Sequence, residues 1–471
     1  MLKKIFNNSL IFAVGPQLPK VASIFVLPII TKDLTALDYG VAAVILAYTG
    51  LLGGIKDLGL TVNLSNIFFR FPLKWKLGWR QIHGYISAWS GIYALLQGLL
   101  LFFIIPLEAN ENRIVIIFLY SVSGLVFDTT ITIGSRFYQF SQKPLYMAIV
   151  SAIVGVLAIA LNLITISFWK MGYMGWFVST FASSALSFVL YFYPVYFKYK
   201  LTPIFRFKWL PFLRQLRISL PVVPHNYSSY LLGASDRMVM SVLGINLSKI
   251  GVYNVANSFG SYFEFAGSAV GMAVGPIYTK LYALKREEEV RILTFFLQFC
   301  FLFGSFLLAL WLKEIFVLLI KNDDLQQGYY LGIIILMGYN YRPMYWTVVN
   351  KLSFYEKTTS LWKISFIAGA VSVILNFILV PIYGYSIAAL TSFVALMYIG
   401  FSGFFLPAYR KLGNNSFYPI LWMAVIICVT ILVYLLKDTS LIYKSLITIA
   451  TMGIAGIVFL KYRYLLKISI E

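Results

Sequence analysis

Cationic side chains occur at four positions inside long apolar stretches of the sequence, where charge is rare. They are Lys20, Lys56, Arg237 and Arg342. A charge in hydrocarbon costs about 3 kcal/mol or more, so such a residue faces a wet cavity or a partner of opposite charge. Guanidinium groups bind phosphate or carboxylate through two parallel hydrogen bonds, and ammonium groups bind them as point charges. The chemistry that these residues offer is therefore the binding of an anion.

Arg342 has the most informative sequence surroundings, because two tyrosines and a proline flank it in the segment Tyr339–Pro343 (YNYRP). Tyrosine rings stack on sugars or on the guanidinium itself, so Tyr339 and Tyr341 are candidates for the same site. Pro343 lacks a backbone N–H and interrupts a helix, which frees a carbonyl for another partner.

Each cation also has a structural alternative. Lys20 lies near the middle of its stretch, too far from the ends to snorkel, and an ion pair with Asp57 or Asp128 would satisfy it. Lys56 lies near the end of its stretch, so snorkelling is an equal alternative. Arg237 either guides an anion near the outer end of its stretch or forms a salt bridge that holds an outer gate.

Four acidic side chains share these apolar stretches. They are Asp57, Asp128, Asp236 and Glu264. Acids inside transporters bind H⁺ or Na⁺, or they only neutralise nearby cations. Equal numbers of acids and cations favour the neutralising alternative. Glu264 has no cation close to it in the sequence, which makes it the strongest candidate for binding a coupling ion.

The elements that must position these charges are about fourteen apolar stretches of roughly 20 residues, the length that a helix needs to cross hydrocarbon. The composition agrees, since 60% of the 471 residues are hydrophobic and only 12% are charged. The sequence therefore predicts an all-α polytopic membrane protein. The predicted spans are residues 9–31, 39–61, 81–106, 114–135, 145–168, 173–197, 218–243, 250–276, 292–312, 328–350, 360–382, 385–408, 418–436 and 441–460.

Basic residues predict the orientation of these spans. Most of the 38 Lys and Arg residues lie at the two termini and in every second connection, which places both termini in the cytoplasm by the positive-inside rule. Topology thus explains most of the net charge of +21, with attraction to anionic lipid as a side effect, and no nucleic-acid partner is required.

Several classes of site are excluded. Cys300 and Cys428 lie within apolar spans, so we expect no disulfide. The sequence has no metal-ligand set, no phosphate-cradling glycine loop and no catalytic triad. The outer connections are too short for a catalytic domain. We therefore expect neither an enzyme nor a bound cofactor or metal.

Three pairs of similar segments recur in one register, roughly 212 residues apart, as in transporters built from repeats. The pairs are Gly40-Val41 with Gly251-Val252, Gln142-Lys143 with Glu356-Lys357, and Asn162, ten residues before Gly172, with Asn376, eight residues before Gly384. An even number of spans in each repeat predicts a pseudo-twofold axis along the membrane normal, with the site between the halves.

The predicted organisation follows from this repeat. It comprises a six-helix half at 1–197, a basic cytoplasmic linker at 198–217, a second six-helix half at 218–408, and two extra helices with a cytoplasmic tail at 409–471. The linker is predicted to contain an interfacial helix around Trp209–Leu216.

Three groups of segments resemble the polysaccharide flippases of the multidrug/oligosaccharidyl-lipid/polysaccharide exporter superfamily. They are Asn376–Leu390 (NFILVPIYGYSIAAL); Ser219–Pro224 (SLPVVP) with Asp236-Arg237 and Gly251–Ala256 (GVYNVA); and Asp38-Tyr39-Gly40 with Asp57–Leu60 (DLGL). Ile387 departs from the pattern, which usually carries glycine there, and we interpret this as a packing change.

The resemblance implies a flippase that moves isoprenoid-diphosphate-linked oligosaccharide units for O-antigen, capsule or exopolysaccharide. Translocation would run from the inner to the outer leaflet of the bacterial cytoplasmic membrane by alternating access. Its implied partners are the polyprenyl-diphosphate-linked oligosaccharide, membrane lipids, and the polysaccharide polymerase and chain-length machinery. The residues expected in the diphosphate and sugar cavity are Lys20, Lys56, Arg237, Tyr339, Tyr341 and Arg342.

Two alternatives stay open within the same superfamily. A lipid II flippase for peptidoglycan fits the cations and the two extra spans equally well. A drug or cation antiporter would need acids in the cavity of the first half to bind organic cations. The first span offers Lys20 and no carboxylate, which argues against the antiporter.

Overall fold

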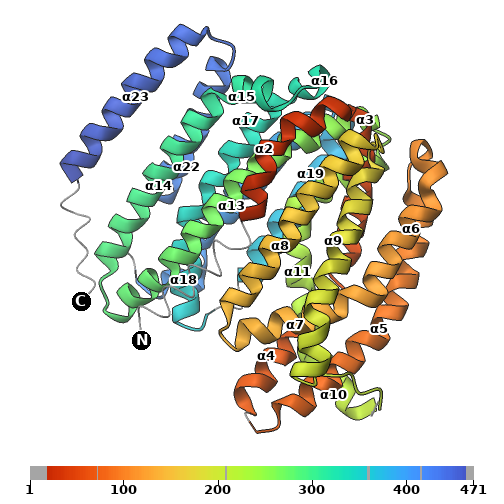
Figure 1. Ribbon diagram of the computed structural model, residues 1–471. Coiled ribbons are helices and arrows are strands. Elements are labelled where there is room, and N and C mark those ends of the chain that lie inside the picture. The colour runs from red at the N-terminus through yellow and green to blue at the C-terminus, as the bar shows by residue number, and fades with distance from the viewer. Residues whose placement is uncertain (1–17, 72, 207–208, 358–360, 414–415, 463–471) are drawn as a thin grey trace. The chain divides into compact units, whose positions relative to one another are not determined.

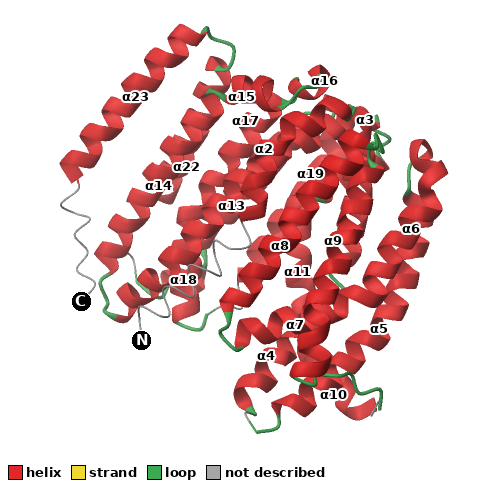
Figure 2. Cartoon of the chain, in the orientation of Figure 1, coloured by secondary structure: helices red, strands yellow, loops and turns green. Residues whose placement is uncertain are grey.

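The computed structural model describes residues 18–462 except 72, 207–208, 358–360 and 414–415, and every regular element in this part of the chain is helical (Figures 1 and 2). Among these residues, nine helices are long and apolar enough to cross a membrane, and Leu441–Ile457 is a shorter apolar helix. The prediction of an all-α polytopic membrane protein is confirmed. The count of fourteen spans and the internal repeat stay predictions.

The chain forms two compact units that meet in sequence between Gly251 and Val252. Helix α13 (Leu247–Ala283) begins in the first unit and continues into the second. The other helices of the first unit are α2 (Leu18–Asp33), α3 (Ala36–Gly53), α4 (Thr61–Arg70), α5 (Trp75–Ile104), α6 (Arg113–Val122), α7 (Asp128–Phe140), α8 (Pro144–Asn162), α9 (Met174–Phe192), α10 (Trp209–Ser219), α11 (Val223–Gly233) and α12 (Ser235–Val242).

The second unit contains the remaining helices, and the predicted domain boundaries stay a prediction. These helices are α14 (Glu287–Leu310), α15 (Leu312–Leu319), α16 (Asp323–Gln326), α17 (Tyr329–Gly338), α18 (Arg342–Phe354), α19 (Leu361–Tyr383), α20 (Ile387–Phe401), α21 (Pro407–Arg410), α22 (Pro419–Leu436) and α23 (Leu441–Tyr462).

Short helical segments of other types interrupt or extend these helices. The 3₁₀ segments are Leu107–Asn112, Leu220–Val222, Tyr339–Tyr341 and Ser402–Phe405. Among the residues that the structure describes, the π-helical segments lie in the first unit and are Ser123–Phe127, Leu163–Phe168 and Tyr193–Lys198. A π-helical segment re-aims the residues that follow it and is frequent at functional sites.

Helix α3 ends earlier than the sequence predicts. We predicted a span through residue 61, whereas the helix stops at Gly53 and turns fill the chain up to Leu60. Two consecutive glycines, Gly53 and Gly54, weaken the helix, and Leu58 and Gly59 then adopt left-handed φ values of 50° and 70°. Lys56 and Asp57 therefore lie on a compact turn rather than on a helix.

Two other predicted spans are interrupted. The span predicted at 218–243 consists of α11 and α12, separated at Ala234. The span predicted at 328–350 is broken by the 3₁₀ turn before Arg342, as Pro343 suggested. The carbonyl of Tyr339, which the missing N–H of Pro343 cannot serve, accepts from the backbone N–H of Arg342 in this turn. The side chain of Gln298 on α14 donates a hydrogen bond to the carbonyl of Asn340 at 2.9 Å.

The predicted linker helix is present as α10. It contacts α4, where the Asn63 amide donates to the carbonyl of Gln215 at 2.9 Å. Its position at the membrane surface stays a prediction. Cys300 and Cys428 are both free thiols, as the sequence predicts.

An aromatic core fixes one end of the first unit. Trp79 is fully buried among α4, α5 and α7, and its indole N–H donates to the carbonyl of Leu64 at 2.9 Å. Phe137 and Tyr138 on α7 pack into the same cluster with Tyr191 on α9. This packing fixes the C-terminal end of α7, which follows the polar residues of that helix.

Charged groups attach the last two helices to the second unit, where α22 and α23 lie beside α14 (Figure 1). The fully buried Lys444 ammonium donates to both carboxylate oxygens of Glu314, at 2.7 and 2.9 Å, and to the carbonyl of Lys437 at 2.8 Å. Asp438 accepts from Lys313 at 2.6 Å and from the Tyr329 hydroxyl at 2.8 Å. Ion pairs and hydrogen bonds thus hold α22 and α23 to the second unit at the end where these two helices are joined.

Candidate functional site

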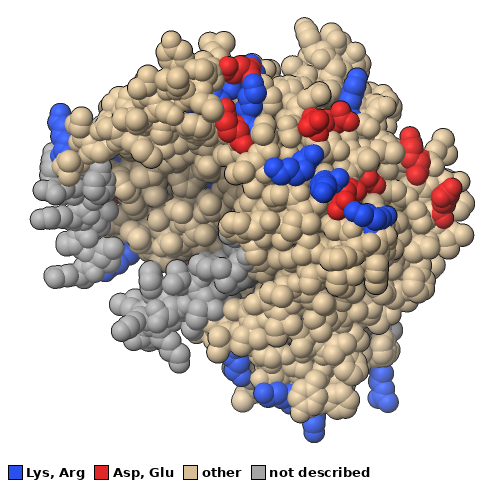
Figure 3. All heavy atoms as spheres, turned by 45° about the horizontal axis from the view of Figure 1, so that its top comes forward, with Lys and Arg blue, Asp and Glu red and all other residues tan. Residues whose placement is uncertain are grey.

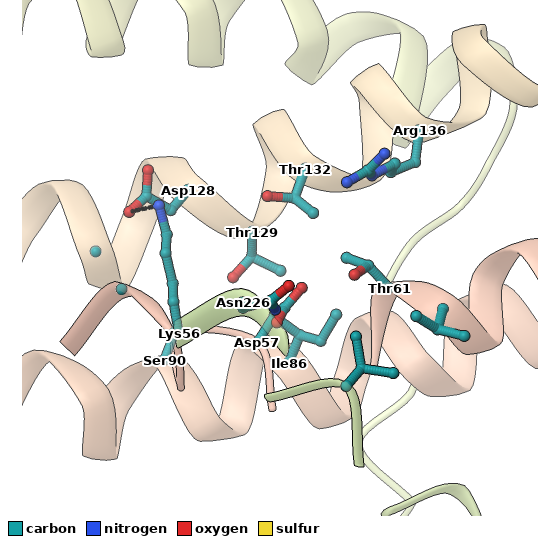
Figure 4. Close-up of a pocket in the computed structure, with 14 residues that line it drawn as sticks. Lys56, Asp57, Thr61, Ile86, Ser90, Asp128, Thr129, Thr132, Arg136 and Asn226 are labelled. Atoms are coloured by element: carbon teal, nitrogen blue, oxygen red, sulfur yellow. Dashed lines mark ion pairs between the residues drawn. The ribbon is translucent and has the colours of Figure 1, made fainter. Parts of the chain in front are cut away.

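A polar cavity of about 300 Å³ opens within the first unit (Figure 4). Its walls are formed by the turn after α3, by α4, α5, the π-helical segment Ser123–Phe127 and α7. Asn226 on α11 and Val222, the residue before that helix, complete them. The lining residues are Gly53, Lys56, Asp57, Thr61, Val62, Ile86, Ser90, Gly124, Asp128, Thr129, Thr132, Arg136, Val222 and Asn226. Charged and hydroxyl-bearing side chains from segments far apart in sequence therefore share one space.

An ion pair between Lys56 and Asp128 crosses this cavity (Figure 4). The Lys56 ammonium lies 2.6 Å from a carboxylate oxygen of Asp128, and the two side chains are 40% and 25% exposed. The pair is therefore reachable from the cavity rather than sealed in the core. An anionic ligand could replace Asp128 as the partner of Lys56, and a cationic ligand could replace Lys56 as the partner of Asp128.

The turn that carries Lys56 is fixed by its own hydrogen bonds. Asp57 accepts from the backbone N–H of Gly59 at 2.9 Å, and the Trp89 indole donates to the carbonyl of Ile55 at 2.9 Å. Gly59 has room for no side chain, since a Cβ atom there would lie 2.5 Å from the carbonyl oxygen of Ser219. Glycine is needed both for this close approach and for the left-handed φ.

Helix α7 contributes a polar stripe to the cavity. Asp128, Thr132 and Arg136 follow one another at steps of four, so they lie on one face of the helix, with Thr129 beside them (Figure 4). The Ser90 hydroxyl on α5 donates to the carbonyl of Leu125 in the preceding π-helical segment at 3.3 Å. That segment sets the rotation at which α7 begins.

The charged lining of this cavity is balanced. Lys56 and Arg136 supply two positive charges, and Asp57 and Asp128 supply two negative ones. Arg136 also donates to the side-chain oxygen of Gln139 at 2.9 Å. An anion that enters must therefore displace an acidic partner or be matched by another positive charge.

The second unit holds a separate charged cluster around Arg342. Its guanidinium lies 2.5 Å from a carboxylate oxygen of Glu264 and donates to the Ser268 hydroxyl at 3.3 Å. The rings of Tyr339 and Tyr341 lie 5.9 and 5.7 Å from the guanidinium carbon, within cation–π range. The two tyrosines thus contact the arginine itself.

Glu264 has a cation close in space although it has none close in sequence. The pair with Arg342 is the arrangement that the neutralising alternative expects, and the role of Glu264 in ion coupling stays a prediction. Its carboxylate is 35% exposed and Arg342 is 13% exposed, so the pair is half-buried. The neutralising alternative describes Glu264 and Asp128 equally well.

The other predicted site residues lie elsewhere. The Lys20 side chain lies outside the described residues. Asp236 and Arg237 are both buried on α12, and Arg237 donates to the carbonyl of Gly233 at the end of α11, at 2.8 Å. This hydrogen bond caps α11 across the break at Ala234.

Sequence reasoning missed the uncharged polar side chains that line the cavity, which are Thr61, Ser90, Thr129, Thr132 and Asn226. A signal for part of it was available. The spacing Asp128, Thr132, Arg136 places three polar residues on one helical face, two inside the span predicted at 114–135 and the third directly after it. Ser90 and Asn226 carry no such pattern, because tertiary packing alone brings them to the cavity.

The fold defines a class of protein. The chain is similar to a multidrug resistance transporter of the MATE family and MOP superfamily, in an inward-facing conformation, at a TM-score of 0.63 and 11% identity, covering 89% of this chain and 99% of that one. It is similar to the lipid II flippase MurJ at a TM-score of 0.60 and 15% identity, covering 93% and 99%. A variant of the Vibrio cholerae MATE transporter VcmN gives a TM-score of 0.53 and 13% identity, covering 87% and 96%. The chain therefore shares the fold of these multi-pass membrane proteins.

The family follows from the sequence itself. A family profile described as "Polysaccharide biosynthesis protein" matches residues 5–282, more than half of the chain. The chain belongs to this family, and the resemblance seen in its segments is confirmed. No curated protein sequence matches the chain.

Proposed function

We propose that this protein translocates polyprenyl-diphosphate-linked oligosaccharide units from the inner to the outer leaflet of the bacterial cytoplasmic membrane. The family match supports a role in polysaccharide biosynthesis, and the fold supports transport by alternating access. The single observation that carries the proposal is the polar cavity in the first unit with its exchangeable Lys56–Asp128 pair.

The physical requirement is a polar path for the head group. A charged diphosphate with its sugars must cross about 30 Å of hydrocarbon, and desolvation makes the unassisted step slow. Hydroxyl groups of Thr61, Ser90 and Thr129 offer hydrogen bonds to sugars, while Lys56 and Arg136 offer charge to the diphosphate. The isoprenoid tail would stay in the lipid throughout.

The charge balance of the cavity suggests how the anion is held and released. In the proposed bound state, a phosphate oxygen replaces Asp128 as the partner of Lys56. Asp128 then regains Lys56 when the head group leaves, which keeps the empty cavity neutral. Asp57 keeps its hydrogen bond to Gly59 in both states.

The remaining predicted residues are part of the proposal. Arg342, with Tyr339 and Tyr341, would contact the head group in the second unit, and Lys20 would face the wet path. Arg237 would act near the outer end. Both termini would be cytoplasmic, and the polysaccharide polymerase and chain-length machinery would receive the product.

A lipid II flippase is the second candidate, and the fold similarity to MurJ favours it over an antiporter. Lipid II is itself a polyprenyl-diphosphate-linked saccharide, so the same cavity chemistry applies. The choice between the two depends on the sugar and not on the diphosphate.

The experiment that tests the proposal is deletion of the gene, followed by extraction of polyprenyl-linked saccharides and their identification by mass spectrometry. Accumulation of an oligosaccharide repeat unit supports the proposal, and its reversal by the wild-type gene but not by the Lys56→Ala variant assigns the cavity. Accumulation of lipid II alone would select the second candidate. Unchanged pools of every such lipid would overturn both.

A further inference from the structure

A second cavity, of about 460 Å³, lies in the second unit and is lined mainly by apolar side chains. Helices α19, α20 and α22 and the 3₁₀ segment after α20 form its walls. Met397 and Phe401 are buried at its floor, while Tyr398, Phe405 and Ile420 are exposed around its rim. Exposed side chains at the rim and apolar side chains inside make the cavity suitable for an apolar ligand that enters from the surroundings.

One exposed cation contacts the rim of this cavity, and two more are adjacent in sequence to that cation or to a lining residue. The Arg410 guanidinium lies 5.4 Å from the ring centroid of Phe405, which lines the rim, and Lys411 follows it in the chain. Lys363 on α19 directly precedes the lining residue Ile364. Cationic and apolar groups thus meet at one place.

The position along the helices matches the boundary between hydrocarbon and water. These residues lie at the first turn of α19, the end of α20 and the start of α22, ends that alternating connectivity places on one side of the membrane. Trp362 is exposed next to Lys363, and tryptophan is enriched at membrane interfaces. The nearby Glu287 pairs with the buried Lys351 at 3.2 Å, which offsets its charge.

We infer that this cavity binds an anionic phospholipid of the surrounding bilayer. One acyl chain fills the apolar space, and the phosphate lies among Arg410, Lys411 and Lys363. Charge complementarity selects the occupant, because cations on an exposed rim match a head group that stays at the surface. The head group of a translocated substrate must instead leave the surface for the interior.

The inference is independent of the proposed function, since none of these residues lines the cavity of the first unit. Each basic residue near an anionic lipid surface strengthens binding about fivefold. Removal of all three charges should weaken binding of an anionic lipid by about a hundredfold.

The test uses the detergent-solubilised full chain and native mass spectrometry, with dioleoyl phosphatidylglycerol and dioleoyl phosphatidylcholine as probes. The wild-type protein should bind phosphatidylglycerol in preference to phosphatidylcholine. The K363Q/R410Q/K411Q variant should lose this preference and about two orders of magnitude in affinity. The matched control R70Q/K74Q/K76Q removes three exposed cations that line neither of the two cavities described here, and it should retain the preference.

A cavity-filling variant tests the acyl-chain part of the inference. Met423→Trp on α22 fills the space and should weaken phosphatidylglycerol binding while leaving the cations in place. Equal binding of the two lipids by the wild type would overturn the inference, as would an equal loss in the matched control. Displacement of bound phosphatidylglycerol by micromolar geranylgeranyl diphosphate would assign the cavity to a polyprenyl substrate and also overturn it.

Discussion

At the scale of single residues, the Lys56–Asp128 pair decides what the cavity of the first unit can hold. Both side chains are partly exposed, so the net strength of their contact is modest, about 1 kcal/mol. A contact of this strength is strong enough to order an empty cavity and weak enough for an incoming phosphate to replace. Its two partners should therefore have opposite effects on anion binding.

Lys56→Ala should abolish polysaccharide export in a deletion strain and weaken binding of geranylgeranyl diphosphate about tenfold, because the cation facing the cavity is lost. Lys56→Arg should retain part of both, since charge is kept while shape changes. Complementation and fluorescence-quenching titration measure the two effects. Lys76→Ala, at an exposed position, is the control, and normal export by Lys56→Ala at native protein levels contradicts the prediction.

Asp128→Asn should strengthen binding of geranylgeranyl diphosphate about three- to tenfold, because Lys56 is released from its acidic partner. Export should fall, since the anion is no longer displaced. Asp57→Asn is the matched control, as it removes one charge from the same cavity but leaves Lys56 paired. Equal tightening in both variants would show that only net charge matters.

Arg342→Ala should lower the free energy of unfolding by about 2 kcal/mol. This is less than for a sealed pair, because Glu264 is 35% exposed. The double variant E264Q/R342M should recover at least half of the loss in thermal stability, since it leaves no unpaired charge. If export also recovers at native protein levels, the pair is structural and Arg342 has no role in head-group binding.

At the scale of elements, the ion pair between Asp438 and Lys313 helps to hold α22 and α23 to the second unit. Asp438 lies outside the membrane-spanning segments, so its carboxyl group can be titrated. The hydrogen bond from Lys313 holds the pKa of Asp438 below its usual value of 3.8, although burial opposes this effect. A lowered folded-state pKa means that the contact stabilises the protein above pH 3.8 and is lost as pH falls below it.

We therefore expect the melting temperature of the Asp438→Asn variant to lie below that of the wild type by a constant amount between pH 7 and about 5. The difference should shrink as the pH falls below about 4, because the wild-type carboxyl group becomes protonated. Thermal unfolding in detergent across this range measures it. A difference that grows toward low pH would contradict the assignment.

Elements were predictable from the sequence where one physical signal dominates. Apolar length predicted the nine long apolar helices of the described residues, and Pro343 marked the interruption before α18. The early end of α3 was missed, because an apolar run hides the weak helix propensity of Gly53 and Gly54. The pairing of Glu264 with Arg342 joins two helices distant in sequence, so no local pattern could reveal it.

At the scale of the whole molecule, Lys and Arg outnumber Asp and Glu by 38 to 17. On the face drawn in Figure 3, the visible Asp and Glu side chains lie in the upper half, with Lys and Arg among them. Because most Lys and Arg residues lie at the termini and in every second connection of the sequence, the orientation with both termini in the cytoplasm stays the prediction.

A reporter that is active only in the cytoplasm should give signal when fused to the C-terminus, because segments rich in Lys and Arg are retained inside. The same reporter inserted after Lys321, in a predicted outer connection, should be silent. A periplasmic reporter should show the reverse pattern at both positions. Signal from a C-terminal periplasmic reporter would invert the orientation.

The π-helical segment Leu163–Phe168 changes how the two halves of this sequence should be compared. It lies between Asn162 and Gly172, ten residues apart, whereas α19 stays α-helical from Asn376 almost to Gly384, eight residues on. A π-helical turn accommodates an inserted residue without ending the helix. Part of this difference in length therefore resides within a helix and not in a loop. Any common ancestry of the two stretches should accordingly be sought with alignments that allow single-residue gaps in mid-helix.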